Sequence, residues 1–479
     1  MSASEYDVII IGAGPVGENV ADRIVQGGLT AAIVESELVG GECSYWAFMP
    51  TKALLRDAAA LRAARSVPGA AAAITGTLDV AAVLARRDRF ASNWSDDGQV
   101  AWLNSAGITL VRGHGRITGP RTVTTTDADG QVTTLTARHA VVVSTGTSAA
   151  VPRIPGLTDS RPWTSREAVA ADHLPDRLTI IGGGVVGTEM ATAYSALGAS
   201  VTLIARDGVL PNVEPYAAEY VISSLIESGA RVMLGASPTR VRRDSDGTVH
   251  VEFDDGQTVV SDELLVATGR KPNTADLGLE HVGLPASSWL TVDDTLRVLD
   301  ASGSPIGDGW LYAVGDVNRR ALLTHQGKYQ ARAAGDVIVA RATGAAVDAS
   351  AWGRHAATAD ERAVPQVIFT DPEIAAVGHT SASAAKAGLR ARSVEYDLGA
   401  VAGAALYADD YTGRASILID DDANTIVGFT AVGPDVTELV HAATIAIAGE
   451  VPLDRLWHAV PAYPTISEVW LRLLETAGR

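Results

Sequence analysis

Two stretches of the chain share one order of apolar and small residues. The first, YDVIIIGAGPVGENV at residues 6–20, passes from a β-branched apolar run into a glycine-rich turn and then a helical pattern. The second begins LTIIGGGVVGTEM at residue 178 and repeats that order. Each stretch predicts a buried strand, a tight turn and the start of a helix, which indicates an α/β fold with two Rossmann-like domains.

The glycines of both stretches have the G-x-G-x-x-G spacing of a dinucleotide-binding loop. The first glycine permits the turn, the second lets the backbone approach a pyrophosphate, and the third lets helix and strand pack closely. The next strand after the first loop, AAIVES, carries an acid near its end that is placed to accept hydrogen bonds from a ribose. The predicted cofactor-binding residues are Gly12, Gly14, Gly17 and Glu35 for the first loop, and Gly182, Gly184 and Gly187 for the second.

Two dinucleotide sites in one chain imply two cofactors, and electron transfer between a flavin and a nicotinamide is the simplest explanation. In the second unit, Ala205 stands where an acid would bind the 2′-hydroxyl of NAD, and Arg206 follows it. An arginine there pairs with a 2′-phosphate, so the sequence predicts NADPH rather than NADH. The alternative is that Arg206 is a solvated surface charge.

Composition narrows the class of protein. The 479 residues are 47% hydrophobic and 20% charged, which is typical of a folded, multidomain globular chain. The net charge of −18 disfavours general binding to nucleic acid or to anionic membranes. No apolar run is long enough to span a bilayer, and Glu5 and Asp7 stand where a signal peptide would be basic. We therefore expect a cytoplasmic protein with no nucleic-acid or membrane partner.

The cysteine and histidine residues show whether a disulfide or a metal site can be expected. Cys43 is the only cysteine, so an intrachain disulfide and a four-cysteine metal site are both excluded. The ten histidines are scattered without metal-ligand spacing, and no metal is predicted.

Further motifs accompany the two loops in a fixed order. They are STG at residues 144–146, ATGRKPN at 267–273, LYAVGDV at 311–317, VPQVIFTDPEIAAVG at 364–378 and YPTISE at 463–468. With these motifs, nearly the whole chain resembles the flavoprotein disulfide reductases, the family of dihydrolipoamide dehydrogenase, glutathione reductase and mercuric reductase. The resemblance implies that FAD is the flavin and assigns roles to five further residues. Gly146 and Gly269 would lie in the segments where the chain crosses between the nucleotide domains. Asp316 would form a hydrogen bond with the ribityl chain of FAD, and Lys52 and Glu189 would form an ion pair near flavin N5.

The resemblance also implies the domain organisation. We expect an FAD-binding domain at residues 1–150, an NAD(P)H-binding domain at 151–272, a central domain completing the FAD site at 273–350, and a C-terminal α+β dimerisation domain at 351–479. The proline-bearing stretches GTSAAVPRIPG and ATGRKPNTADLG fit the first two boundaries. A two-fold homodimer is expected, in which the C-terminal residues reach the other subunit's site.

The chain departs from the family pattern at two places. The family's redox dithiol has the spacing C-x₄-C, and here Cys43 aligns with the first cysteine and Phe48 with the second. The family's catalytic histidine precedes Pro-Thr, and here Tyr463 takes its position while the supporting acid, Glu468, is kept. A single thiol cannot store two electrons as an intrachain disulfide, and a tyrosine is a poor base at neutral pH. His458 is a possible replacement base, although a structural role beside Trp457 is the stronger interpretation.

These departures lead to three functional hypotheses. The first is an NADPH:acceptor oxidoreductase that passes electrons through FAD directly to a small acceptor such as a quinone. Tyr45, Trp46 and Phe48 would then line an aromatic acceptor pocket, with Tyr463 protonating the reduced acceptor; alternatively, these rings only fill the volume that the dithiol vacated. The second hypothesis is a thiol, disulfide or peroxide reductase that uses Cys43 alone. The third is a flavin-binding protein that has lost its activity.

Overall fold

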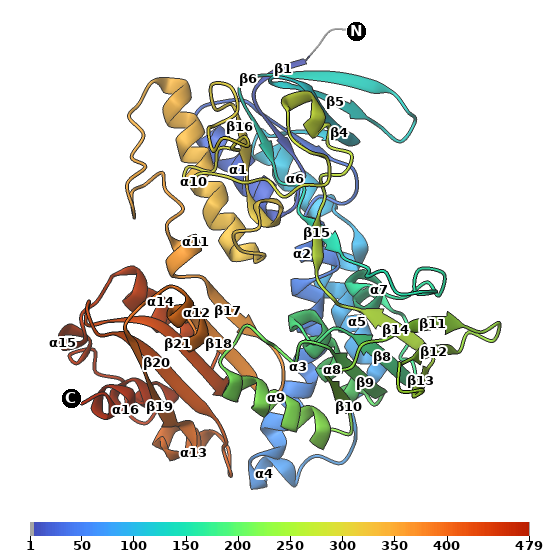
Figure 1. Cartoon of the computed structure of the whole chain (residues 1–479), viewed down its shortest axis with the longest axis vertical. Coiled ribbons are helices and arrows are strands. Elements are labelled where there is room, and N and C mark those ends of the chain that lie inside the picture. The colour runs from blue at the N-terminus through green and yellow to red at the C-terminus, as the bar shows by residue number, and fades with distance from the viewer. Residues whose placement is uncertain (1–3, 479) are drawn as a thin grey trace. The chain divides into compact units, whose positions relative to one another are not determined.

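The computed structural model describes residues 4–478, which form two compact units (Figure 1). Unit 1 holds the chain up to Met49 together with Asp88–Ser148 and Arg270–Glu361. Unit 2 holds Pro50–Arg87, Ala149–Gly269 and the chain from Arg362 onward. Three helices and one strand continue across these divisions: α3 (Phe48–Arg65), α5 (Val80–Phe90), α11 (Ala359–Arg362) and β7 (Thr147–Ala149).

Unit 1 is built on a seven-stranded sheet in the order β3-β2-β1-β6-β5-β4, with β16 also pairing with β6. Its strands are β1 (Ser4–Ile11), β2 (Ala31–Glu35), β3 (Thr109–Arg112), β4 (His114–Gly119), β5 (Thr122–Thr126), β6 (Val132–Val143) and β16 (Leu311–Ala313). The central strands are parallel, and the apolar run of β1 is fully buried. Burial on both faces explains why this run is continuous rather than alternating.

Two long helices of unit 1 lie side by side in Figure 1 and share the core of the sheet. They are α1 (Pro15–Gln26) and α10 (Thr324–Thr343). A Cβ at Gly335 would lie 2.7 Å from the Cβ of Arg23, so a glycine is needed where the helices approach. The other elements of this unit are α2 (Gly41–Tyr45), α6 (Asp97–Ser105), β15 (Arg270–Pro272) and the 3₁₀ turns η1 (Ser92–Trp94), η2 (Leu279–Val282) and η3 (Gly315–Asn318).

Unit 2 contains a parallel sheet that repeats the parallel part of the first sheet. Its order is β10-β9-β8-β14, made by β8 (Arg177–Ile181), β9 (Ser200–Ala205), β10 (Arg231–Leu234) and β14 (Glu263–Val266). A three-stranded antiparallel sheet accompanies it, formed by β11 (Arg240–Arg243), β12 (Val249–Glu252) and β13 (Thr258–Ser261). The helices of this part are α4 (Pro68–Ala71), α7 (Ser165–Ala170), α8 (Val185–Leu197) and α9 (Pro215–Glu227).

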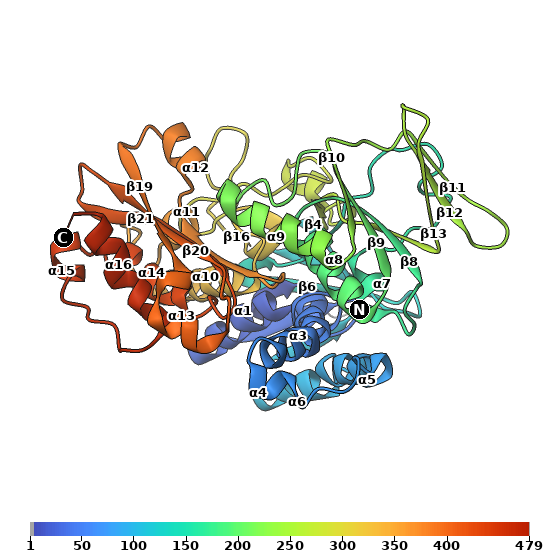
Figure 2. The same ribbon diagram turned by 90° about the horizontal axis from the view of Figure 1, so that it is seen from below.

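The C-terminal part of unit 2 is an antiparallel sheet in the order β17-β18-β21-β20-β19. Its strands are β17 (Pro365–Ile368), β18 (Glu373–Gly378), β19 (Ala391–Asp397), β20 (Arg414–Asp420) and β21 (Thr425–Gly433). Figure 2 shows α14 and α16 beside this sheet. Its helices and turns are α12 (Ser381–Lys386), η4 (Leu398–Ala400), α13 (Ala402–Tyr407), α14 (Leu439–Ala448), α15 (Leu453–Leu456), η5 (Ile466–Glu468) and α16 (Val469–Thr476). The expected α/β fold with a C-terminal α+β part is confirmed.

The structure groups some regions differently from the expected four domains. The expected central region, 273–350, shares the core of unit 1, because β16 pairs with β6 and Leu311 belongs to the same apolar cluster. Residues 50–87, expected within the FAD-binding domain, group with unit 2. Residues up to Glu361, expected within the C-terminal domain, group with unit 1 because Asp360 bonds to two side chains of α10.

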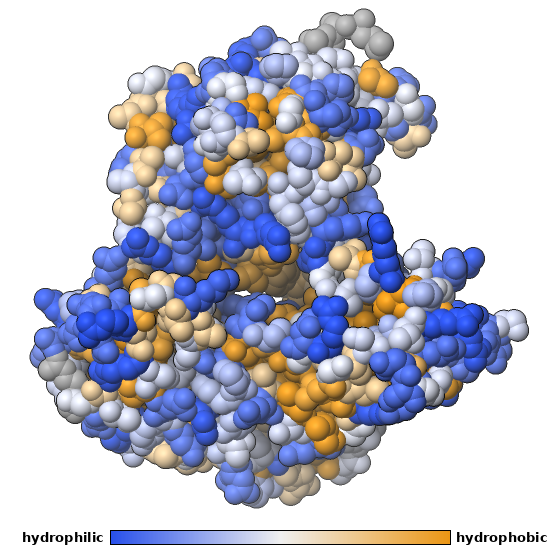
Figure 3. Space-filling model, viewed as in Figure 1, coloured by the Kyte–Doolittle hydropathy of each residue, from blue (hydrophilic) through white to orange (hydrophobic). Residues whose placement is uncertain are grey.

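Hydrophilic and apolar residues are interspersed on the face seen in Figure 3. Among the helices of residues 4–478, none combines the length and apolar character needed to cross a bilayer.

Candidate flavin and pyridine nucleotide sites

The first glycine loop has the geometry that its spacing predicts. Gly12 has φ +103°, and a Cβ there would lie 2.5 Å from the carbonyl oxygen of Ser144. A Cβ at Gly17 would overlap the carbonyl oxygen of Gly12, whereas a Cβ at Gly14 would meet no atom within 4 Å. Gly14 is also the N-cap of α1, so open space lies where backbone N–H groups and the helix dipole favour a pyrophosphate.

Two further groups border this loop. The Glu35 carboxylate accepts hydrogen bonds from the backbone N–H of Ala13 at 2.7 Å and of Glu37 at 2.8 Å. A Cβ at Gly41 would lie 2.9 Å from the Cα of Gly14. The short helix α2, which carries Cys43, therefore begins against the first loop.

Asp316 lies on the turn η3 and belongs to a small polar chain. Its Oδ2 accepts a hydrogen bond at 2.8 Å from the Thr147 hydroxyl, which in turn accepts one at 2.5 Å from Arg270 Nε. Burial raises the pKa of Asp316, while Thr147 and Arg270 oppose that shift. Thr147 and Arg270 were not among the expected site residues, although Thr147 directly follows the STG motif and Arg270 lies in the ATGRKPN motif.

These residues fit a flavin dinucleotide. Gly14 leaves a cradle for the pyrophosphate, and the Glu35 and Asp316 carboxylates can accept hydrogen bonds from sugar hydroxyls. Gly146 has φ +67°, and a Cβ added there would meet no atom within 4 Å. The backbone at Gly146 therefore also has open space beside it.

The second glycine loop, in unit 2, repeats the first. Gly182 has φ +124°, and a Cβ there would overlap the carbonyl oxygen of Ala267. A Cβ at Gly187 would overlap the carbonyl oxygen of Gly182, and one at Gly184 would meet no atom within 4 Å. Gly269, at the later crossing, has φ +139° and is equally open.

The residues expected to select the nucleotide lie at the end of β9. Ala205 is fully buried, whereas Arg206 is exposed. The Arg206 guanidinium pairs with the neighbouring Asp207 at 2.6 Å, and this contact raises the pKa of Arg206. A 2′-phosphate at this position would therefore compete with Asp207 for the arginine.

Lys52 and Glu189 form the ion pair that the resemblance implies. Lys52 Nζ lies 2.7 Å from Glu189 Oε2, and the glutamate is buried. The other oxygen, Oε1, accepts a hydrogen bond at 3.0 Å from the backbone N–H of Phe369, whose ring centroid lies 4.9 Å from Lys52 Nζ. Sequence reasoning missed Phe369, which stands in the quoted motif VPQVIFTDPEIAAVG.

The expected aromatic pocket residues differ in their environment. Tyr45 is fully buried, and its hydroxyl donates to the carbonyl oxygen of Val39 at 2.9 Å. Burial raises the pKa of Tyr45 to about 12. Trp46, Phe48 and Cys43 are partly exposed. The structure thus places Tyr45 in the core, where it cannot contact an acceptor, and leaves Trp46 and Phe48 accessible.

The C-terminal motif does not form the acid–base pair of the family pattern. Tyr463 is 76% exposed, whereas Glu468 is buried and its Oε1 lies 2.5 Å from Nη2 of Arg472. The second oxygen, Oε2, is buried and has no hydrogen-bond partner among residues 4–478. His458 is exposed on the surface. The acid is thus held by an arginine one helical turn away, and it makes no hydrogen bond to the tyrosine.

Comparison with known families decides the class of protein. Residues 6–338 match the pyridine nucleotide-disulphide oxidoreductase family, and residues 364–473 match its dimerisation domain. The chain belongs to this family. Its members are FAD-dependent oxidoreductases that use a pyridine nucleotide, and the matched dimerisation domain supports a homodimer.

Similar proteins agree with this assignment over nearly full lengths. A dihydrolipoyl dehydrogenase of Rhizobium etli is 30% identical and aligns with 100% of this chain and 99% of its own length. A mercuric reductase of Staphylococcus aureus is 29% identical over 97% of this chain and 81% of its own. Among solved structures, LpdA from Mycobacterium tuberculosis is 26% identical, covers 100% of both chains and has a TM-score of 0.82. The flavoprotein disulfide reductase RclA of Escherichia coli, 22% identical over 99% of both chains with a TM-score of 0.82, shares the fold.

Within residues 4–478, no group of three or more His, Cys, Asp or Glu side chains is placed to hold a metal ion.

Proposed function

We propose that this protein is an NADPH:acceptor oxidoreductase that passes electrons from FAD directly to a small acceptor such as a quinone. One observation carries the proposal: Cys43 is the only cysteine, and Phe48 occupies the position of the second sulfur. Because the dithiol relay of the family needs two sulfurs, electrons must leave the flavin by another route. The overall reaction moves two electrons and one proton from NADPH to the quinone, and a second proton completes the hydroquinone.

The chain's own residues hold the reactants in this proposal. Bound FAD would accept a hydride equivalent and release two electrons. The first glycine loop would hold its pyrophosphate, while Glu35 and Asp316 would accept hydrogen bonds from its hydroxyls. Lys52, fixed by Glu189, would supply a localised positive charge near the flavin.

On the acceptor side, the partly exposed Trp46 and Phe48 would face the acceptor, and in the expected homodimer the exposed Tyr463 would reach the other subunit's site. Flat aromatic rings suit a conjugated acceptor, and an exposed phenol can donate a proton to a reduced oxygen. Tyr45 is left out because it is buried and its hydroxyl is already engaged. The ion pair between Arg472 and Glu468 also supports the loss of the family's thiol-activating acid–base pair, because Glu468 is the acid that would orient the base.

A second candidate, a reductase that uses Cys43 as its only sulfur, is favoured by the partial exposure of that thiol. It lacks a base in the C-terminal motif, because Tyr463 has replaced the histidine.

The test compares wild type with Cys43→Ser in NADPH oxidation against a para-quinone and against small disulfides. We expect quinone turnover within about twofold of wild type in Cys43→Ser, and negligible disulfide turnover in both proteins, because the sulfur takes no part. Disulfide turnover that disappears with the substitution would support the single-sulfur reductase instead. Absence of any flavin bleaching by NADPH under anaerobic conditions would favour an inactive flavin-binding protein.

Arg206→Glu tests the choice of nucleotide. We expect kcat/KM for NADPH to fall by about 10²-fold, because a charge-assisted contact to the 2′-phosphate is replaced by repulsion. The value for NADH should change much less or rise. Asp207→Asn is the complementary variant. Because it removes the carboxylate that competes with the 2′-phosphate for Arg206, kcat/KM for NADPH should increase. If wild type and both variants use NADH and NADPH with equal kcat/KM, Arg206 does not select the nucleotide.

A further inference from the structure

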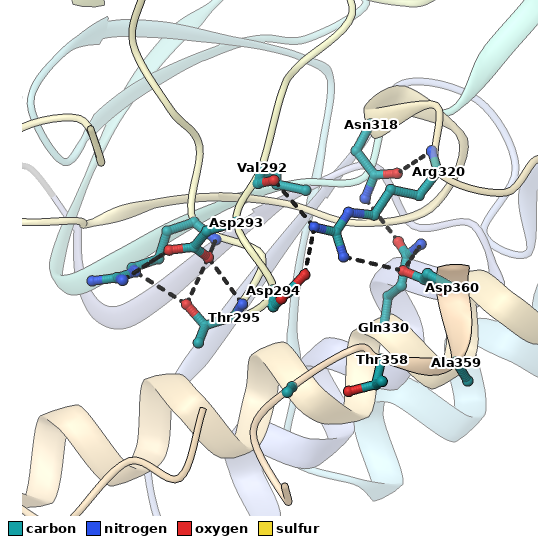
Figure 4. A network of polar contacts seen from close by, with 12 residues as sticks. Val292, Asp293, Asp294, Thr295, Asn318, Arg320, Gln330, Thr358, Ala359 and Asp360 are labelled. Atoms are coloured by element: carbon teal, nitrogen blue, oxygen red, sulfur yellow. Dashed lines mark hydrogen bonds and ion pairs between the residues drawn. The ribbon is translucent and has the colours of Figure 1, made fainter. Parts of the chain in front are cut away.

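A buried polar network in unit 1 joins Asp360 and Gln330 to Asn318 (Figure 4). Gln326 and Gln330 lie four residues apart on α10, so they share one face of that helix. The side-chain N–H groups of both donate to Asp360 on α11, at 2.7 Å from Gln326 to Oδ1 and at 2.9 Å from Gln330 to Oδ2. The Asp360 side chain has no exposed surface.

Gln330 connects this carboxylate to the turn η3. Its Oε1 accepts two hydrogen bonds, from the backbone N–H of Gly315 at 2.7 Å and from Asn318 Nδ2 at 2.8 Å. Gly315 and Asn318 are the first and last residues of η3, and Asp316 lies between them. One amide group therefore holds both ends of the turn, and its own orientation is set by Asp360.

The packing beside this contact is tight. A Cβ at Gly327 would lie 3.2 Å from the Cα of Gly315, so α10 runs close against the turn. A glutamine that rotated away would deprive the buried Gly315 N–H of this acceptor and would leave Asn318 Nδ2 with only its hydrogen bond to the carbonyl oxygen of Ala313 at 3.1 Å. Losing such hydrogen bonds is costly in a protein interior.

We propose that Asp360 is a positioning residue that acts through Gln330 on the turn carrying Asp316, and that its negative charge is needed for that turn to retain FAD tightly. Amide N–H groups make stronger hydrogen bonds to a carboxylate than to a neutral acceptor. The charge thus fixes the Gln330 amide in the orientation in which its oxygen faces η3. The proposal concerns FAD retention, so it does not depend on the identity of the electron acceptor.

The charge of Asp360 is sensitive to pH near neutrality. Burial raises its pKa to about 6, while Arg320 and the two glutamines oppose that shift. Arg320 Nη1 lies 3.8 Å from Asp360 Oδ2, Asp294 pairs with the same arginine at 3.0 Å, and Glu361 is the neighbouring acid on α11. An acid with this pKa is charged at pH 7.5 and mostly neutral at pH 5. We therefore expect retention of FAD to weaken as the pH falls through 6.

The experiment measures the rate of FAD release from the holoenzyme by flavin fluorescence between pH 5 and pH 7.5. In wild type we expect release to be about tenfold faster at pH 5, the difference of one charge-assisted hydrogen bond. Asp360→Asn should release FAD quickly at both pH values. Glu18 on α1 titrates in the same range, because burial raises its pKa to about 7. The difference in release rate between pH 5 and pH 7.5, called the pH step, can therefore contain a contribution from Glu18. The contribution of Asp360 is the part of the pH step that Asp360→Asn removes.

Two more variants make the test specific. Gln330→Met should release FAD as fast as Asp360→Asn does, and the double variant should be no faster. Both substitutions break the same connection, which runs from Asp360 through Gln330 to η3. Asp7→Asn is the matched control: it neutralises another buried carboxylate of unit 1 that bonds Thr30 rather than η3, so it should keep the wild-type pH step. Additive effects of Asp360→Asn and Gln330→Met, or a pH step that survives Asp360→Asn unchanged, would overturn the proposal.

Discussion

Lys52→Met is expected to lower the rate of flavin reduction by NADPH by about 10²-fold and to destabilise unit 2 by about 3 kcal/mol. The substitution leaves the buried Glu189 carboxylate without its cation, and a buried charge that loses its partner is strongly destabilising. The backbone N–H of Phe369 remains as a hydrogen-bond donor, but it carries no charge. Stopped-flow flavin absorbance measures the first effect, and denaturant unfolding followed by a probe in unit 2 measures the second.

The double variant Lys52→Met with Glu189→Gln separates these two effects. It removes both charges, and the glutamine can still accept the hydrogen bond from Phe369, so most of the stability should return. The slow flavin reduction should remain, because the positive charge is still missing. A double variant as unstable as Lys52→Met would mean that the ion pair acts through packing instead.

Gly187→Val and Gly184→Val are expected to fail in different ways, although they lie in one loop. A side chain at position 187 would overlap the carbonyl oxygen of Gly182, so α8 would have to move away from its strand. We expect this to destabilise the second Rossmann-like domain by at least about 3 kcal/mol. A Cβ at position 184 would meet no atom within 4 Å apart from its chain neighbours, so Gly184→Val should fold normally. It would occupy the space for the pyrophosphate, and KM for NADPH should rise by about 10²-fold or more.

FAD content is the internal control for this pair of variants. Gly184→Val should keep a full complement of FAD, because the first glycine loop is untouched, whereas NADPH should no longer protect the protein against unfolding. A Gly184→Val protein with unchanged KM would show that the second loop does not bind the nucleotide.

Several features of the site could be predicted because they depend on residues close together in sequence. The overlap that forces a glycine at position 17 is with Gly12, and that at position 187 is with Gly182, so spacing alone carries the information. The continuous apolar run of β1 likewise predicted a buried strand, and its residues from Val8 to Ile11 are buried. The single cysteine is a property of composition and needs no structure.

Other features could not be predicted from local patterns. Tyr45 was expected to line the acceptor pocket, but its hydroxyl donates to the carbonyl oxygen of Val39 and its ring lies in the core. Glu468 is placed as in the family, yet Arg472 on the next turn takes its carboxylate. In both cases side-chain burial and competition between partners decided the outcome, and neither has a periodic signal in sequence.

The sequence by itself determined the two dinucleotide loops, the family and the missing sulfur, because backbone sterics and covalent chemistry act over a few residues. Only the tertiary structure decided which distant groups hold the reactive ones in place. Phe369 meets a glutamate 180 residues earlier in the chain, and Asp360 meets the two glutamines of α10, which orient the turn bearing Asp316. These contacts arise from the packing of sheets and helices, which brings polar groups from separate elements into a low-dielectric interior where each must find a partner.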